Sequence, residues 1–188
     1  MTHIALFHSV YGLRPAVLAA AGRFRAAGHR VVAPDLYGGE VATTVDEGFA
    51  LIGRIGWATI MQRARDAVRD LPDDAVLAGF SMGTGVVSGL LAERPDTAGL
   101  LLLHGTGGEL ASARDGLPVQ LHIAEHDEYF DDAEVAAWRK ATAEAGAAAE
   151  VFTYPGVGHL FTDPDTPDHD EAASVLTWQR SLDFLDRC

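Results

Sequence analysis

Short apolar runs alternate with longer segments of helical period along the whole chain. Six of these runs have the apolar or β-branched residues and the flanking loop residues that are typical of buried strands. The six predicted strands are Ile4–Phe7, Val31–Ala33, Ala75–Ala78, Gly99–Leu103, Val119–Ile123 and Glu150–Thr153. Apolar strands that alternate with helices predict an α/β fold with a doubly wound, mostly parallel sheet of about six strands.

Helical segments separate the predicted strands. Pro15–Ala27 and Asp131–Ala145 are each followed by a glycine, which commonly ends a helix. Either Asp131 or Asp132 is expected to cap the second of these helices. A final helix is predicted over Glu171–Asp186, and the apolar residues expected on its core face are Ala172, Val175, Leu176, Leu182 and Leu185.

Two segments depart from this regular alternation. Thr43–Leu71 is too long for one crossover helix and predicts two helices, with a break near Gly53 and Gly56. Thr106–Gly116 is rich in glycine and small residues, so a regular helix is not indicated there. Four apolar residues of the first segment are candidates to overhang a cleft: Phe49, Ile52, Trp57 and Met61. No repeat or linker interrupts the pattern, and residues 1–188 are expected to form one domain.

The charge balance excludes two classes of binding partner. The chain has 27 acidic and 14 basic residues and a formal charge of −13, which repels nucleic-acid phosphates and anionic lipid. We therefore expect no nucleic-acid or membrane partner, and a monomer or homodimer. Cys188 is the only cysteine, which fits the reducing cytoplasm. Abundant alanine beside a single lysine, Lys140, indicates a GC-rich bacterial genome.

The sequence Gly79-Phe80-Ser81-Met82-Gly83 lies between a predicted strand and a helix that runs to about Arg94. In that context Gly-x-Ser-x-Gly is typical of a nucleophile elbow, a strained turn that exposes the serine oxygen. The glycines leave room for the tight turn, and the helix N-terminus offers free N–H groups to a developing negative oxygen. Two alternatives stay open: a turn needed only for close packing, and a phosphate-binding loop, although the P-loop lysine is lacking.

A serine hydroxyl needs a base, and the base needs an acid that fixes its tautomer. Two segments follow predicted strands at the end of the sheet where parallel sheets bind ligands: residues 124–128, and residues 154–161 with His159. His159 is the leading candidate for the base, with His104 and His126 as minor candidates. The candidates for the acid are Asp127, Glu125, Glu128 and Asp131. A metal site from His8, His104 and His126 has no recognisable ligand spacing, and we expect no metal.

Several motifs, taken together in chain order, resemble the dienelactone hydrolase family. They are His8-Ser9-Val10-Tyr11-Gly12, the Ala33–Gly39 segment, the Gly79–Gly83 elbow, Asp127, and Gly158-His159-Leu160-Phe161 followed by a last helix with Trp178. The resemblance implies a short α/β-hydrolase fold in which Ser81 is the nucleophile, Asp127 the acid and His159 the base. It also implies that the backbone N–H groups of Met82 and Val10 form the oxyanion hole. The strand pattern agrees on Val10, because the first and third strands are expected to flank the switch point of the sheet.

Two positions depart from the family pattern. Dienelactone hydrolases use a cysteine nucleophile where this chain has Ser81, and a thiol-activating glutamate where it has Ser9. A serine needs no such glutamate, so both changes are consistent with a serine esterase.

The leading hypothesis is therefore a serine-dependent hydrolase of a small carboxylic ester or lactone, without a cofactor. The alternatives are a ligand-binding or signalling protein with little turnover, and an acyltransferase. The candidates for the substrate pocket are Ser9, Tyr11, Tyr37, Trp57 and His104. Core packing is the favoured interpretation for Phe161 and Trp178.

Overall fold

A single six-stranded parallel sheet organises the chain, in a computed structural model that describes residues 1–188. The strands are β1 (His3–Phe7), β2 (Arg30–Val32), β3 (Val76–Phe80), β4 (Leu100–Leu103), β5 (Pro118–Ala124) and β6 (Ala148–Tyr154), in the spatial order β2-β1-β3-β4-β5-β6. Every neighbouring pair is parallel. All six predicted strands are present, which confirms the doubly wound α/β fold.

Six helices connect or follow the strands: α1 (Pro15–Ala26), α2 (Val45–Ile55), α3 (Trp57–Val68), α4 (Met82–Leu91), α5 (Asp132–Glu144) and α6 (Glu171–Leu185). Asp131 caps α5 through a reciprocal pair of hydrogen bonds with Glu134. Thr106–Gly116 holds no helix, and its backbone is tied down by Trp138, whose Nε1 donates to the Gly108 carbonyl at 2.9 Å. None of the helices is both long and apolar enough to span a bilayer.

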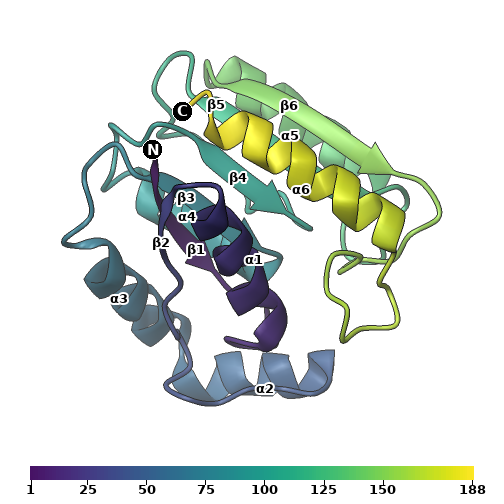
Figure 1. Cartoon of the computed structure of the whole chain (residues 1–188). Helices are drawn as coiled ribbons and strands as arrows, with labels where there is room; N and C mark the ends of the chain where they lie inside the picture. Colours follow the sequence, from purple (N-terminus) through teal and green to yellow (C-terminus); the bar gives the residue numbers. More distant parts are fainter.

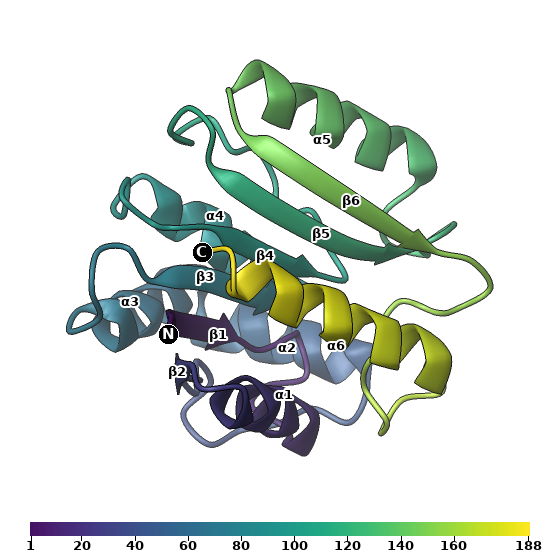
Figure 2. The same cartoon turned by 45° about the horizontal axis from the view of Figure 1, so that its top comes forward.

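Alternate residues of each central strand face opposite sides of the sheet, and helices cover both sides. In β1, Ile4 and Leu6 pack with α1 and α6, whereas Ala5 and Phe7 pack with α3 and α4. In β4, Leu101 lies on the same face as Ile4 and Leu6, and Leu102 lies on the opposite face. Figures 1 and 2 show the resulting layers, with α1 and α6 on one face and α3, α4 and α5 on the other. Both strand faces are buried, which explains why the strands read as continuous apolar runs.

The switch point of the sheet lies between β1 and β3. The connection from β1 leads outward through α1 to β2, and the chain then crosses back to β3, where Phe7 is in register with Gly79. The loop after Phe7 therefore lies beside the turn that carries Ser81, as the sequence predicted. Figure 1 shows α2 across the carboxyl ends of these central strands, where it can cover a site.

The break between α2 and α3 is at Gly56, which has a φ of 85° and serves both helices as a cap. The predicted pair of helices is thus confirmed, whereas Gly53 lies within α2. Phe49 and Trp57 are exposed and reach the cleft, but the cleft prediction was wrong for Ile52 and Met61. Met61 is part of the core, and Ile52 packs against it.

The core face of α6 differs from the prediction. Val175 and Leu176 are 57% and 38% exposed, and Ala172 is exposed too. The buried face consists of Ala173, Ser174, Thr177, Trp178, Ser181, Phe184 and Leu185. Small side chains allow close packing on the sheet, and Ser174 satisfies its hydroxyl by donating to the Phe161 carbonyl at 2.8 Å. Trp178 and Phe161 are core residues, as predicted.

Candidate active site

Ser81 lies in a strained turn between β3 and α4. Its φ of 47° and ψ of −109° lie outside the regions that a serine readily adopts. The close approach of neighbouring backbone requires the flanking glycines: a Cβ on Gly83 would lie 2.5 Å from the Phe7 carbonyl oxygen, and one on Gly79 would overlap the Gly83 backbone. The turn is held by the Ser81 N–H, which donates to the Leu103 carbonyl at 2.7 Å. This geometry is that of a nucleophile elbow.

Three side chains from distant parts of the sequence meet at this turn. Ser81 Oγ lies 2.9 Å from His159 Nε2, and His159 Nδ1 lies 2.8 and 3.0 Å from the two carboxylate oxygens of Asp127. The carboxylate accepts from Nδ1–H, so Nε2 is free to accept the serine proton. Asp127 also accepts from the Tyr129 N–H at 2.9 Å, and its side chain is fully buried. The arrangement has the order and contacts of a Ser-His-Asp triad.

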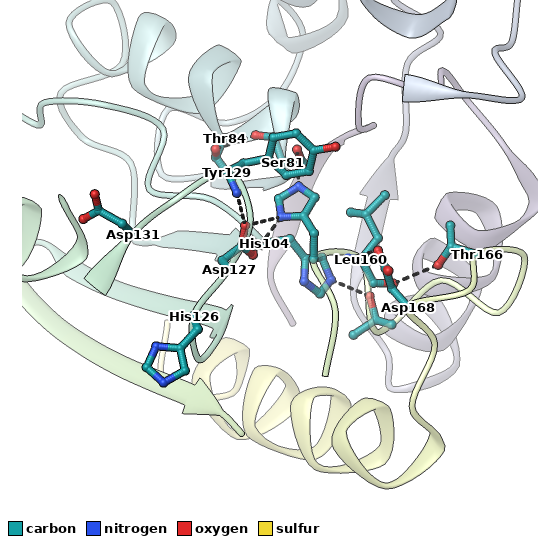
Figure 3. A network of polar contacts seen from close by, with 12 residues as sticks. Ser81, Thr84, His104, His126, Asp127, Tyr129, Asp131, Leu160, Thr166 and Asp168 are labelled. Atoms are coloured by element: carbon teal, nitrogen blue, oxygen red, sulfur yellow. Dashed lines mark hydrogen bonds and ion pairs between the residues drawn. The ribbon is translucent and has the colours of Figure 1, made fainter. Parts of the chain in front are cut away.

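The other acids considered from the sequence do not reach His159. Glu125 and Glu128 are exposed, and Asp131 caps α5. The side chain of His126 is 77% exposed and pairs with Asp132 at 2.7 Å. Figure 3 shows His126 and Asp131 turned away from the line that joins Ser81 to Asp127.

His104 is fully buried behind the triad and does not line a pocket, so its prediction as a pocket residue was wrong. Its Nε2 lies 2.6 Å from Thr162 Oγ1, and its ring packs edge-on against Phe161. Burial lowers the pKa of His104 well below its ordinary value, so the ring stays neutral. It follows β4 at the expected end of the sheet, but its side chain turns into the core.

The loop after β1 holds one peptide unit in a fixed orientation beside Ser81. His8 is completely buried, and its Nε2 accepts from the Leu36 N–H at 3.1 Å. This contact leaves the proton on Nδ1, which donates to the Ser9 carbonyl at 2.7 Å. The Gly12 N–H donates to the same carbonyl at 3.1 Å. Since the Val10 N–H belongs to this peptide unit, these two bonds fix its direction.

The Val10 N–H donates no hydrogen bond within the protein. The Met82 N–H is the first of α4 and has no partner within the helix. Tyr37 connects the two residues: its hydroxyl donates to the Val10 carbonyl at 3.1 Å and lies 3.3 Å from Met82 Sδ. Two free backbone donors are thus held beside the nucleophile elbow.

Tyr37 and Ser9 do not line the cavity that opens beside Ser81 and His159, and their prediction as pocket residues was wrong. Tyr37 is 2% exposed because its hydroxyl bonds to the Val10 backbone. Burial raises its pKa to a value beyond the normal range of a phenol. Ser9 is buried because its Oγ accepts from the Tyr11 N–H at 3.3 Å, within its own loop.

A cavity of about 330 Å³ opens beside Ser81 and His159. Tyr11 and Trp57 line it, as predicted. Lining residues that the sequence did not reveal are Val45, Thr84, Gly85, Gly107, Gly108, Tyr129, Phe130 and Leu160. Tyr129 and Phe130 stand two and three residues after Asp127, and this spacing could have indicated them.

The remaining histidines do not form a metal site. No group of three or more histidine, cysteine, aspartate or glutamate side chains comes together as ligands. His8 is bonded to backbone groups, His104 to Thr162 and His126 to Asp132.

Comparison with known proteins gives consistent matches. A model of the dienelactone hydrolase family matches residues 2–188. A carboxymethylenebutenolidase from Rhodococcus opacus is 28% identical over an alignment 208 positions long, which covers 98% of this chain and 80% of that protein.

Solved structures show the same architecture. A dienelactone hydrolase-like promiscuous phosphotriesterase from metagenomic libraries superposes with a TM-score of 0.81 at 19% identity, over 100% of this chain and 86% of that one. A dienelactone hydrolase from Anabaena variabilis gives a TM-score of 0.67 at 22% identity, over 99% and 86%. These likenesses establish the α/β-hydrolase fold.

Proposed function

The chain belongs to the dienelactone hydrolase family and is a carboxylic ester hydrolase, and from that premise we propose that it cleaves a small ester or lactone through an acyl intermediate on Ser81. The observation that carries the proposal is the continuous contact from Ser81 Oγ to His159 and on to Asp127, at 2.9 and 2.8 Å. Ser81 stands where the family nucleophile is a cysteine. A serine nucleophile at this position is supported by the hydrogen bond between Ser81 Oγ and the base, His159 Nε2.

Acylation follows from the protonation states in the site. Ser81 Oγ attacks the carbonyl carbon of the ester while its proton passes to His159 Nε2. The buried carboxylate of Asp127 stabilises the imidazolium that forms and holds the ring in place. His159 then gives the proton to the leaving alcohol as the carbon–oxygen bond of the ester breaks, which leaves the acyl group on Ser81.

Deacylation repeats the same steps with water. His159 Nε2 removes a proton from water, the hydroxide attacks the acyl carbonyl, and the proton returns to Ser81 Oγ as the acid product leaves. In both steps the negative carbonyl oxygen needs donors, and the N–H groups of Val10 and Met82 are the free backbone donors beside the elbow. Removal of one such donor costs about 10²–10³-fold in rate in comparable sites.

Covalent labelling by a fluorophosphonate tests the nucleophile directly. We expect one label per chain, on Ser81, because the probe needs an activated serine. The label is lost in Ser81→Ala and in His159→Ala, whereas Ser88→Ala, a serine on the same α4 helix, keeps it. A folded wild-type protein that takes no label, or takes it elsewhere, overturns the proposal.

Product analysis separates hydrolysis from the two alternatives. Steady release of acid from p-nitrophenyl esters supports a hydrolase, whereas binding without turnover over hours indicates a ligand-binding protein. Added alcohol or peroxide is expected to divert only a minor share of the acyl group. A product that is mainly the new ester or peracid indicates an acyltransferase.

A further inference from the structure

The cavity beside Ser81 is lined mostly by apolar residues and by no charged side chain of arginine, lysine, aspartate or glutamate. Fifteen residues line it, and none of them is an arginine, lysine, aspartate or glutamate. The polar groups among them are Ser81, His159, Thr84 and two tyrosine hydroxyls. The cavity therefore offers apolar contact over most of its surface and no fixed positive charge to a ligand.

Three exposed aromatic side chains line this cavity, and we call Phe49, Trp57 and Tyr129 the aromatic wall. They are 57%, 42% and 42% exposed, and no other aromatic side chain of the chain is exposed to this extent. All three face the same cavity. Exposed apolar surface gathered at one place marks a binding surface, because scattered residues need no such explanation.

A cation beside the cavity lining, Arg14, is already paired. The Arg14 guanidinium lies over the Tyr11 ring, 4.3 Å from its centre, and Tyr11 lines the cavity. Arg14 forms an ion pair with Asp163, and both side chains are only 12% exposed. A ligand carboxylate would have to compete with a buried partner that is already in place.

Carboxylates lie near two tyrosines that line the cavity, Tyr11 and Tyr129. Burial raises the pKa of Tyr129, and the nearby carboxylate of Glu128 raises it further, as does that of Asp168. Burial also raises the pKa of Tyr11, where the Arg14 guanidinium opposes the effect of the same carboxylates. Tyr129 lines the cavity, so the negative field of these carboxylates reaches the part of the lining that this tyrosine forms. With a formal charge of −13 on the whole chain, this field repels anions on approach.

We infer that the site takes neutral esters and lactones whose non-reacting part is apolar, and that it selects against those that carry a carboxylate. The inference rests on the proposed function and names its substrate class. An apolar group gains contact with the aromatic wall, whereas a carboxylate loses water and finds no cation in return.

Four p-nitrophenyl esters test the inference: the acetate, the hexanoate, the glutarate half-ester and its methyl ester. The last two have the same acyl chain, and the methyl group of the second removes the negative charge of the first. At pH 7.5 we expect kcat/KM for the half-ester to be at least 100-fold below that of the methyl ester. The hexanoate is expected to exceed the acetate by about 10- to 100-fold, because its longer chain reaches the wall.

Variants of the wall locate the effect. Phe49→Lys adds a cation to the cavity, and the ratio between methyl ester and half-ester is expected to fall at least tenfold. Val175→Lys is the matched control, since Val175 is also 57% exposed but lies on α6, outside the cavity. Trp57→Ala is expected to lower the ratio of hexanoate to acetate about tenfold.

The outcomes separate the two proposals. If Ser81 takes the fluorophosphonate label but the half-ester reacts within threefold of the methyl ester, the substrate inference is wrong and the function stands. An equal change in Phe49→Lys and Val175→Lys also overturns it, because net charge and not the cavity would then set the preference. A chain that takes no label and cleaves none of the esters overturns both proposals.

Discussion

Two parts of the site are built in opposite ways. The proposed catalytic residues Ser81, His159 and Asp127 are joined by directional hydrogen bonds, and His159 and Asp127 are buried. The aromatic wall is exposed, and its side chains make contacts without hydrogen bonds, as where the Tyr129 ring packs edge-on against His159 with 4.7 Å between the ring centres. Hydrogen bonds fix atoms to a fraction of an ångström, whereas apolar contact tolerates a change of shape.

This difference predicts that substitutions in the two parts of the site have different kinetic effects. Changes among the hydrogen-bonded groups are expected to lower kcat for every ester, because they disturb the transition state itself. Changes in the aromatic wall are expected to alter which ester is preferred. Substitutions at Asp127, His8 and Gly48 test this division by kinetics, and His122 tests the role of the buried groups in stability.

Asp127→Asn removes the charge behind His159 and keeps the shape. The amide can donate toward Nδ1, which favours the tautomer whose Nε2 carries the proton and cannot act as a base. We expect kcat to fall about 10⁴-fold with the thermal midpoint little changed. Asp131→Asn is the control four residues away, since asparagine caps a helix as well as aspartate does. Similar kcat values for the two variants would contradict the role of Asp127.

His8→Ala removes the Nδ1–H that holds the Ser9 carbonyl, and with it the direction of the Val10 N–H. We expect kcat to fall about 10- to 100-fold with KM nearly constant, because an oxyanion donor acts mainly in the transition state. The measurement is steady-state kinetics on one neutral ester.

His8→Asn supplies the control for this position. The asparagine amide can occupy the place of Nδ1 and donate to the same carbonyl, so it is expected to restore most of kcat. If the alanine and asparagine variants lose kcat equally, or if only KM changes, His8 does not act through the Val10 peptide unit.

The part of the site that the sequence could predict is the part that depends on backbone position. Strand ends locate Ser81, Asp127 and His159, because the carboxyl ends of parallel strands meet at one edge. Residue type then limits the chemistry, and glycines mark the tight turn. Side-chain direction is not available from this pattern. His104 and Tyr37 also follow strands at the correct end, yet both side chains turn into the core.

The helix faces show a similar limit. In α6 the apolar residues Val175 and Leu176 suggested the wrong face, because hydrophobicity alone does not count a serine as buried. Ser174 is buried because a carbonyl accepts its proton, a contact that only the tertiary structure supplies. The sequence pattern also does not show the cavity lining, since Gly107 and Tyr129, from the loops that follow β4 and β5, line the same cavity only in the folded chain.

Gly48→Ala tests whether the two parts of the site are separate. Gly48 belongs to α2, the helix that carries Phe49, but an added Cβ would lie 2.5 Å from the Val10 carbonyl oxygen. We expect kcat to fall about tenfold for all esters, with the preference between acetate and hexanoate unchanged. Gly53→Ala is the control in the same helix, since nothing lies within 4 Å of its added Cβ. A change of preference without loss of kcat would show that α2 acts only through the wall.

Stability in acid is also expected to depend on buried, hydrogen-bonded groups. His122 of β5 is completely buried, with Nδ1 2.7 Å from the Tyr154 hydroxyl and Nε2 2.8 Å from Gln120 Oε1. Burial lowers its pKa to about 3 in the folded protein. The unfolded chain binds this proton near pH 6.5 and the folded protein does not, so stability is complete above pH 6.5 and decreases as the pH falls toward 3.

One such histidine corresponds to a loss of roughly 2 kcal/mol in the free energy of unfolding between pH 7.5 and pH 5. Urea unfolding at the two pH values measures this difference. His122→Gln is expected to reduce the difference by about that amount, because glutamine can keep both contacts but does not titrate. His3→Gln, at the partly exposed start of β1, is expected to leave the difference unchanged. If His122→Gln shows the same difference between the two pH values as the wild-type protein, groups other than His122 control acid unfolding.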